Sequence, residues 1–408
     1  MPHLLSINNY HYRRGGSDVM YFDHATLMES QGWKNAFFSM HHPKNFDSSW
    51  SKFFVNEIEF GHAYSALDKI KMASKVIYSF EAQNKLRTLL NEYPASIAHL
   101  HCIYHHLSPA ILPILKKASI PVVLTAHDLK LACPAYKMLN SHGICEKCKS
   151  GNYLDLIKYR CIKDSLLAST VVAMESSLHK LLGSYKNNVN RIVAPSQFFR
   201  NKLVEWGWPK EQITYIPNYV DISKFELSES VGKYFLYFGR LAPEKGVATL
   251  INAAVKAKVP LKIVGTGPLE TQLKSQAAEN AQQIEFLGYK TGQDLIDLIQ
   301  NSRCVVLPSE WYENAPMSVL ESYAQGKTVI GAKIGGIPEL INEGETGWMF
   351  ESKNQEALAD LLVKVNQLTD EKLMSMGHDC RTFVGGTFNR QRYIDGTLRL
   401  YSELGVAA

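Results

Sequence analysis

Residues 234–267 read YFLYFGRLAPEKGVATLINAAVKAKVPLKIVGTG. The apolar runs Tyr234–Phe238 and Leu261–Val264 have the length of buried strands, and each ends at a glycine. The residues between them are numerous enough to form a helix that crosses over a sheet. A strand, a crossover helix and a second strand are the repeating unit of a parallel α/β sheet.

The same alternation of apolar runs and helix-length segments extends along all 408 residues. These strand candidates are too many for one compact sheet, so we expect two Rossmann-like, doubly wound domains facing a cleft. The candidates are Leu4–Ile7, Ala36–Ser39, Ile97–Leu100, Val122–Thr125, Thr170–Met174, Arg191–Ala194, Tyr234–Phe238, Leu261–Val264, Ile284–Phe286, Cys304–Leu307 and Thr328–Gly331.

The domain boundary is expected where Pro217-Asn218 precedes the polar stretch Asp221–Lys233. This places a first domain over residues 1–220, with a cysteine-rich insertion at about 130–165. The second domain then begins at residue 221.

The composition is that of an ordinary globular protein, with 46% hydrophobic and 20% charged residues, and it excludes disordered, collagen-like and coiled-coil chains. No apolar run approaches the eighteen residues of a membrane-spanning helix. The first residues lack the basic stretch and long apolar core of a secretory signal. We therefore expect a cytoplasmic protein.

The charge is unevenly distributed along the chain. Residues 1–220 hold 25 Lys+Arg against 16 Asp+Glu, whereas residues 221–408 hold 19 against 23. A basic first domain suggests an anionic partner such as nucleic acid, phospholipid headgroups or a phosphorylated ligand, although two differently solvated surfaces would also explain it. Within it, the segment Ala63–Leu90 predicts a basic amphipathic helix that lies either on a membrane or in solvent.

Three loops carry residues suited to phosphate groups. Gly15-Gly16 follows the first strand and opens a helix, where backbone N–H groups can approach an anion, although a tight turn also explains the pair. Gly265-Thr-Gly267 also follows a strand, but it lacks the third glycine of a dinucleotide site, so it gives little support to dinucleotide binding. Arg240 and Lys245 follow the strand Tyr234–Phe238, and their charges suit a diphosphate.

The segment Glu313–Glu321 combines two carboxylates with a helix start. Pro316 suits the first position of a helix, so free N–H groups near Met317–Val319 offer a second anion site. Glu313 and Glu321 flank that site and could hold the hydroxyl groups of a sugar and a ribose around a diphosphate. The alternative is an ordinary acidic loop followed by a helix-face glutamate.

His127-Asp128 follows the strand Pro121–Thr125 and is expected to point toward the cleft, like the loops above. Such a histidine can act as a general base, donate a hydrogen bond to substrate, or form a structural pair with the aspartate.

Four cysteines, Cys133, Cys145, Cys148 and Cys161, lie within 29 residues in the pattern C-x11-C-x2-C-x12-C. The C-x2-C step predicts a structural zinc site, although the outer spacings fit no standard zinc finger. Disulfides are less expected in a reducing compartment. A catalytic metal is not expected here, because four thiolates close the coordination shell.

Taken in order, these motifs resemble those of the retaining glycosyltransferases of family 4. The resemblance spans nearly the whole chain, and its most specific element is the E-x7-E pattern from Glu313 to Glu321. One departure is Tyr219, where the family usually has glycine. The matching segments are Gly15-Gly16, Thr125–Asp128, Ala194–Ser196, Ile216–Asp221, Phe238–Arg240, Glu244–Gly246, Phe286–Gly288 and Glu313–Glu321.

The resemblance implies an α/β GT-B fold in which residues 221–387 form the donor domain and residues 388–408 a helix crossing back onto the first domain. It implies retaining transfer of a hexosyl or N-acetylhexosaminyl group from a UDP- or GDP-sugar to a glycan or lipid-linked acceptor.

No catalytic metal is implied. No Asp-x-Asp occurs in the sequence, so there is no evident site for a Mg²⁺ ion on the diphosphate. We expect surface polysaccharide or lipopolysaccharide biosynthesis by a peripheral enzyme at the inner face of the cytoplasmic membrane, with an anionic membrane surface as partner and no nucleic acid.

The resemblance also implies residue roles. Arg240 and Lys245 would bind the donor diphosphate, Glu313 the donor-sugar hydroxyls and Glu321 the ribose. Gly16 would approach the phosphates, and His127 would lie against the donor sugar. With His127, Arg240, Lys245 and Glu313 as the catalytic set, the other expected donor-binding residues are Gly15, Gly16, Gly265, Gly267, Leu287, Asn314, Met317, Ser318, Val319 and Glu321.

Two alternatives remain open. A nucleotide-sugar epimerase or hydrolase would share the two-domain architecture and release free sugar or sugar nucleotide. A zinc-stabilised nucleic-acid-binding protein would use the basic half, but it would leave the second domain without a role.

Overall fold

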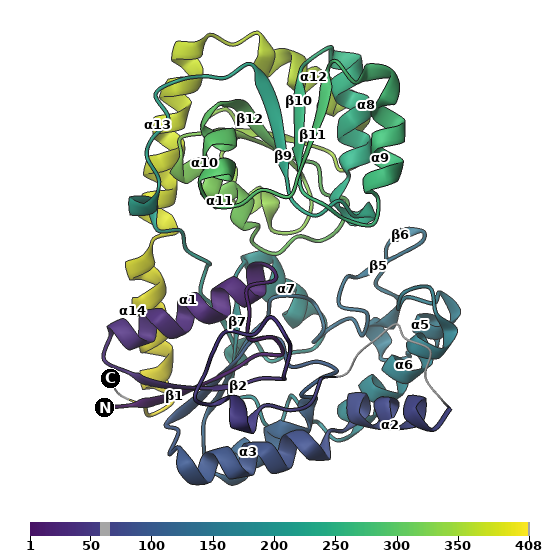
Figure 1. Ribbon diagram of the computed structural model, residues 1–408, viewed down its shortest axis with the longest axis vertical. Helices are drawn as coiled ribbons and strands as arrows, with labels where there is room; N and C mark the ends of the chain where they lie inside the picture. The colour runs from purple at the N-terminus through teal and green to yellow at the C-terminus, as the bar shows by residue number, and fades with distance from the viewer. Residues whose placement is uncertain (58–65, 407–408) are drawn as a thin grey trace. The chain divides into compact units, whose positions relative to one another are not determined.

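The computed structural model describes residues 1–57 and 66–406, and the side chains of these residues except for 66–71 (Figure 1). The chain forms two compact units. Unit 1 contains residues 1–195, 199–216 and the chain from Ile394 onward, and unit 2 contains residues 196–198 and 217–393. None of the described helices is both long and apolar enough to cross a lipid bilayer.

Unit 1 is built on a parallel six-stranded sheet of order β2-β1-β3-β4-β7-β8, with the small antiparallel hairpin β5-β6 beside it. Its strands are β1 (His3–Ile7), β2 (Lys34–Phe38), β3 (Ile97–Leu100), β4 (Val122–Thr125), β5 (Leu139–Asn140), β6 (Gly143–Ile144), β7 (Arg191–Ala194) and β8 (Ile213–Tyr215). Its helices are α1 (Gly16–Ser30), α2 (Ala66–Ile77), α3 (Phe80–Glu92), α4 (Leu112–Lys117), α5 (Leu154–Lys158), α6 (Leu166–Leu181), most of α7 (Gln197–Glu205) and most of α14 (Arg390–Glu403).

Unit 2 contains a second parallel six-stranded sheet, of order β11-β10-β9-β12-β13-β14. Its strands are β9 (Tyr234–Phe238), β10 (Leu261–Val264), β11 (Ile284–Gly288), β12 (Ser302–Leu307), β13 (Val329–Ala332) and β14 (Gly347–Phe350). Its helices are α8 (Val247–Ala257), α9 (Glu270–Ala277), α10 (Gly292–Gln300), α11 (Met317–Ala324), α12 (Gln355–Asn366) and α13 (Asp370–Thr387).

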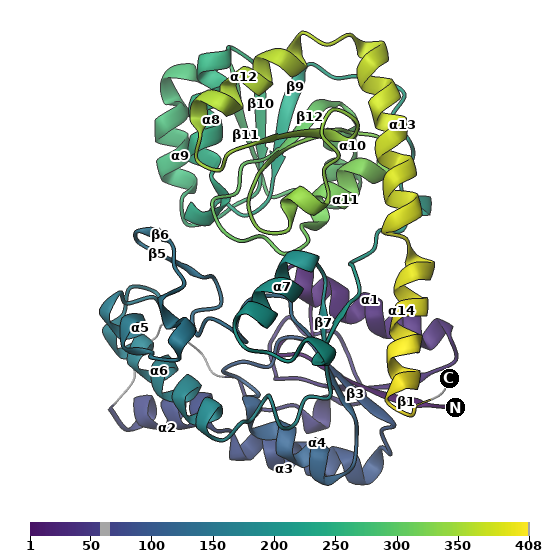
Figure 2. The same ribbon diagram turned by 180° about the vertical axis from the view of Figure 1, so that it is seen from behind.

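Helices cover both faces of the unit 2 sheet, as Figure 1 and its reverse view in Figure 2 show. Along β9, Phe235 and Tyr237 pack into one apolar cluster with α8, α9 and α12, while Leu236 packs into the other with α10, α11 and α13. Successive side chains of a strand point to opposite faces, so a strand buried on both faces is apolar throughout. This explains why continuous apolar runs, rather than alternating ones, mark these strands in the sequence.

The predicted strand Thr170–Met174 is wrong, because these residues lie inside helix α6. The run Thr170-Val171-Val172 is β-branched, which favours a strand when it is considered alone. In the structure, Ser165 caps the helix by accepting a hydrogen bond from the Ala168 N–H, and the surrounding residues extend it over four turns. The prediction also omitted the short strands β8 and β14.

The single helix predicted over Ala63–Leu90 is replaced by α2 and α3, and residues 63–65 lie outside the described part of the chain. The break occurs at Ser79, whose hydroxyl accepts the Ala82 N–H and caps α3. The described basic side chains of this region have partners within unit 1, since Lys75 pairs with Glu81 and Lys85 donates to the Lys52 carbonyl.

Helix α14 is attached to unit 1 through Tyr401, which is completely buried. Its hydroxyl lies 2.9 Å from His24 Nε2 and 2.6 Å from His99 Nδ1. Burial lowers the pKa of His24 to about 3 and places the pKa of His99 well below its usual value, so both imidazoles are neutral at pH 7.

Tyr401→Phe is expected to reduce the free energy of unfolding by about 1–3 kcal/mol, because it removes the shared partner of two buried imidazoles. Urea denaturation of the full chain measures the loss. The matched control is Tyr289→Phe, at a side chain that is largely exposed, and it should leave stability unchanged. Equal stability of the two variants would contradict this role for Tyr401.

Candidate functional site

The order of strands in unit 2 reverses between β9 and β12. The chain runs from β9 outward to β10 and β11 and then returns to pair β12 with the other side of β9. The loops that follow β9 and β12 therefore start next to each other at the carboxyl edge of the sheet, which is where open α/β sheets bind ligands. The β9 loop carries Arg240 and Lys245, and the β12 loop carries Glu313.

Glycine lets these loops approach closely. Gly246 has φ of +66°, and a Cβ on it would lie 2.0 Å from the Pro308 carbonyl oxygen, so only glycine fits between the two loops. A Cβ on Gly265 would lie 1.9 Å from Gly239 O, and one on Gly267 would lie 2.3 Å from Leu241 O. Positions 265 and 267 are both predicted to bind the donor. The packing of the loops against each other already explains why both are glycine.

Lys245 and Glu313 form an ion pair at this edge, with Lys245 Nζ 2.6 Å from Glu313 Oε1. Ser309 donates a second hydrogen bond to the same oxygen at 2.6 Å, and Lys245 Nζ lies 5.1 Å from the centre of the Trp311 ring. Burial raises the pKa of Glu313, but the Lys245 charge and the two hydrogen bonds outweigh burial, so the pKa lies below its usual value. Glu313 is therefore a charged carboxylate held in one orientation.

Arg240 has a fixed backbone and an exposed side chain. Its carbonyl oxygen accepts hydrogen bonds from the buried Tyr237 hydroxyl at 2.9 Å and from the Ala242 N–H at 3.1 Å. The loop is anchored by these bonds while the guanidinium group remains accessible to a ligand.

Helix α11 begins directly after Pro316. The Val319 N–H donates to the Pro316 carbonyl at 3.1 Å, whereas the N–H groups of Met317 and Ser318 have no acceptor in the described chain. These two donors, at the positive end of the helix dipole, suit an anion. The preceding Asn314 accepts a hydrogen bond from Ser196 at 2.9 Å, which orients its amide.

Glu321 lies one turn further along α11. Burial raises the pKa of its carboxyl to about 7, in contrast to the lowered pKa of Glu313. The two predicted carboxylates thus differ in their environment. Burial acts on both, but a cation and a hydroxyl donor offset it at Glu313, whereas burial is the cause of the shift at Glu321. Leu287, also predicted at the donor site, packs on the apolar cluster of the α11 face.

In unit 1, the predicted phosphate loop opens α1. The Gly15 carbonyl accepts the N–H groups of Asp18 and Val19, each at 3.0 Å. A Cβ on Gly15 or Gly16 would meet no atom within 4 Å, so packing does not require glycine here and the space beside the backbone is open. Asp18, whose carboxylate accepts from Asn8 Nδ2 at 2.9 Å, fixes the first turn of this helix.

His127 follows β4, and its Nε2 lies 2.7 Å from His101 Nδ1, with the two rings stacked at 5.0 Å. Burial lowers the pKa of His127 to about 4 and raises the pKa of Asp128 to about 6. His127 is therefore neutral at pH 7 and suited to donate or accept hydrogen bonds. Asp128 does not bond to it in the described contacts but accepts the Lys130 backbone N–H at 2.9 Å.

The four cysteines of the insertion are all free thiols, of which Cys133 and Cys148 are buried. Burial and the neighbouring cysteines raise the pKa of Cys148 to about 12 and of Cys161 to about 11. Within the described ranges, no three His, Cys, Asp or Glu side chains are arranged to hold a metal ion. The side chains as placed do not form a zinc site, and zinc binding by Cys133, Cys145, Cys148 and Cys161 stays a prediction.

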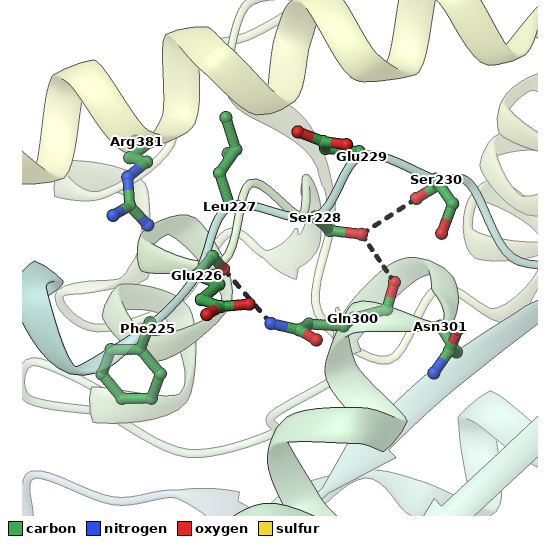
Figure 3. Close-up of a pocket in the computed structure, with 9 residues that line it drawn as sticks. All are labelled: Phe225, Glu226, Leu227, Ser228, Glu229, Ser230, Gln300, Asn301 and Arg381. Carbon is green, nitrogen blue, oxygen red and sulfur yellow. Dashed lines mark hydrogen bonds between the residues drawn. The ribbon is translucent and has the colours of Figure 1, made fainter.

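Unit 2 also has a surface groove outside this edge, shown in Figure 3. It is lined by the linker residues 225–230 together with Gln300, Asn301 and Arg381. Its polar groups bond to one another: Ser228 Oγ donates to the carbonyls of Ser230 and Gln300. The groove contains none of the predicted site residues.

Sequence reasoning missed the residues that hold the predicted ones in place, namely Ser309, Trp311 and His101. His101 had a usable signal, since His99-Leu-His101 ends β3 and β3 pairs with β4 in parallel. Ser309 follows β12 but stands in an unremarkable Pro-Ser-Glu sequence, and only the fold brings it to Glu313.

A family model described as glycosyltransferase family 4 matches residues 14–224, and one described as glycosyl transferases group 1 matches residues 221–379. The amylovoran biosynthesis glycosyltransferase AmsK of Erwinia amylovora is 27% identical over 195 residues, which cover 44% of this chain and 48% of AmsK. The chain spans about half the length of most curated relatives that it matches.

Two solved structures share the fold over nearly the whole chain. A glycosyltransferase from Rickettsia africae superimposes with a TM-score of 0.68 at 17% identity, covering 100% of this chain and 99% of the other. Anabaena HepE in complex with UDP-glucose superimposes with a TM-score of 0.67 at 16% identity, covering 98% and 99%. With two parallel Rossmann-like sheets and both family models matched, the chain belongs to the family 4 glycosyltransferases of the GT-B fold.

Proposed function

We propose that this protein transfers a hexosyl or N-acetylhexosaminyl group from a UDP- or GDP-sugar to a glycan or lipid-linked acceptor, with retention of configuration and without a catalytic metal. The observation that carries the proposal is the Lys245–Glu313 ion pair at the reversal point of the unit 2 sheet, close in sequence to the start of α11. A donor is supported by the UDP-glucose named in the HepE structure. Surface polysaccharide synthesis is supported by the name of AmsK.

The proposed chemistry follows from charge. Cleavage of the sugar–phosphate bond leaves a nucleoside diphosphate and an oxocarbenium-like sugar. Arg240, Lys245 and the N–H groups of Met317 and Ser318 stabilise the negative charge that develops on the leaving group, which is usually the largest catalytic contribution. Glu313, kept ionised by Lys245, accepts hydrogen bonds from donor-sugar hydroxyls, and Glu321 accepts them from the ribose.

In unit 1, the backbone N–H groups of Gly15 and Gly16 bind phosphate oxygens, and His127 hydrogen bonds to the donor sugar. In a retaining transfer of this kind, the acceptor hydroxyl attacks from the side of the leaving group and passes its proton to a phosphate oxygen. The neutral His127 then positions the donor and need not accept that proton.

The test is nucleotide release from a panel of UDP-, GDP- and ADP-sugars, with a chelator present. We expect slow release from one donor by the wild type and loss of that release in Glu313→Ala. Analysis of the sugar product separates the alternatives, because a hydrolase or epimerase yields free sugar or a changed sugar nucleotide as its main product even when a glycan acceptor is supplied. Absence of both release and binding for every sugar nucleotide would contradict the proposal.

Arg240→Ala and Lys245→Ala are each expected to lower kcat by about two orders of magnitude or more, because each removes a preorganised positive charge. Steady-state rates with the identified donor measure the effect. The matched control is Lys274→Ala, which removes an exposed lysine of α9 that pairs with Glu270 on its own helix and lies 6.0 Å from the centre of the Phe286 ring. Turnover like that of the wild type in either site variant would remove that residue from the mechanism.

Glu321→Gln is expected to stabilise the protein at pH 8 but not at pH 4.5. The folded pKa of Glu321, about 7, lies above the usual 4.5, so the folded state holds the proton more tightly and stability is lost as pH rises between these values. The variant should therefore melt roughly 2–5 °C above the wild type at pH 8, measured by thermal unfolding.

The same variant should bind the donor about tenfold more weakly at pH 8, because a neutral amide accepts ribose hydrogen bonds less strongly than a carboxylate. Isothermal titration with the donor measures this affinity. A melting-temperature difference that is the same at both pH values, or unchanged donor affinity, would contradict the role given to Glu321.

A further inference from the structure

Helix α6 has its amphipathic character reversed. Of the five residues that it buries, three are polar: Ser169 is 0% exposed, Glu175 is 1% exposed and His179 is 3% exposed. The other two are Val172 and Ala173. The apolar residues Leu167, Met174 and Leu181 are 62%, 56% and 84% exposed. A helix on the surface of a soluble protein normally has the opposite arrangement.

The buried polar face is held by specific bonds, which fix the rotation of the helix. Glu175 forms an ion pair at 2.8 Å with Lys130, and both side chains are buried. His179 Nε2 lies 2.7 Å from the Ile77 carbonyl oxygen, and Ser169 Oγ accepts the Ile162 N–H at 3.1 Å. Turning α6 to hide its apolar side would break the ion pair and leave charges buried without a partner, which is strongly unfavourable.

The apolar residues on this side of α6 form one stripe, in which Val171 and Leu178 are half-buried and the others are exposed. Leu167, Val171, Met174, Leu178 and Leu181 are spaced by three or four residues, so they line a single side of α6, and Leu182 extends the line. Leu154, on the adjoining helix α5, is also largely exposed. We call Leu167, Val171, Met174, Leu178, Leu181 and Leu182 the α6 stripe.

Positive charge lies at both ends of the stripe. Lys158, Arg160 and Lys163 precede α6, and Lys180 and Lys186 lie at or after its end. The acidic residues between positions 154 and 186 are Asp155, Asp164 and the buried Glu175. If two copies of the chain paired antiparallel through this stripe, the basic ends would face each other and repel. An anionic surface with an apolar interior is complementary to both features.

We infer that the α6 stripe is a docking site for an anionic phospholipid membrane. The leucine and methionine side chains enter the boundary between headgroups and acyl chains, while the flanking lysines and Arg160 contact lipid phosphates. Residues 1–220 as a whole carry nine more positive than negative charges, which also favours an anionic surface as the partner. The inference concerns membrane attachment alone and does not depend on the proposed transfer reaction.

Vesicle sedimentation of the full chain tests the inference. The wild type should bind vesicles of phosphatidylcholine with roughly one-third phosphatidylglycerol more tightly than vesicles of phosphatidylcholine alone, and less tightly as salt rises. Met174→Glu and Leu181→Glu should each weaken binding to the anionic vesicles about tenfold. The matched control is Val363→Glu, an exposed apolar position of α12 in unit 2 that undergoes the same change of charge and should retain wild-type binding.

Several outcomes would overturn the inference: no binding of the wild type to anionic vesicles, equal binding to both vesicle types, or stripe variants that bind like Val363→Glu. A dimer that Leu181→Glu dissociates, seen by light scattering, would assign the stripe to a second copy instead. Thermal unfolding checks that the variants remain folded. Nucleotide release from the donor panel reports on transfer separately, so failure of membrane binding and failure of the proposed function are distinguishable.

Discussion

Both units depend on a parallel sheet that is buried on both faces and whose strand order reverses beside its first strand. Burial on both faces makes the strands largely apolar. A polar strand residue such as His99 of β3 is bonded to buried partners, Tyr401 and Thr125. The reversal separates the crossover connections on either side of the first strand and leaves the loops at its carboxyl end uncovered. In unit 2 these are the loops of Lys245 and Glu313, and glycine at position 246 allows them to touch.

The ion pair of Lys245 and Glu313 shows how such a site is prepared before a ligand arrives. A carboxylate this deeply buried would ordinarily be protonated, but the adjacent ammonium group and the Ser309 hydroxyl keep it charged. Burial raises the pKa of Glu321 to about 7. The two glutamates of the E-x7-E pattern, eight residues apart, therefore have different electrostatic properties, which the spacing alone does not show.

Helix α6 illustrates a conflict between local and tertiary preferences. Its apolar side faces solvent because the Lys130–Glu175 pair and the His179 contacts require the polar side to face unit 1. Lys130 follows Asp128 by two residues and donates its backbone N–H to that carboxylate, so the loop that carries His127 and the rotation of α6 share one anchor. Natural proteins tolerate such an exposed apolar face where it serves an interaction.

The sequence by itself determined the two parallel α/β sheets, ten of their twelve strands, and the motif residues that the loops present, because long apolar runs and glycine-bounded turns are local signals. It could not determine the interior of α6, since Thr170-Val171-Val172 favours a strand until the Ser165 cap and the Glu175 ion pair are known. It also could not show that the pKa of Glu313 is lowered while that of Glu321 is raised, or that His101 contacts His127, because these features depend on groups brought together from distant parts of the chain. Ser309 is only four residues from Glu313, but its hydrogen bond depends on the conformation of the loop. Tertiary structure alone decided these features, because desolvation and electrostatic pairing act through space rather than along the sequence.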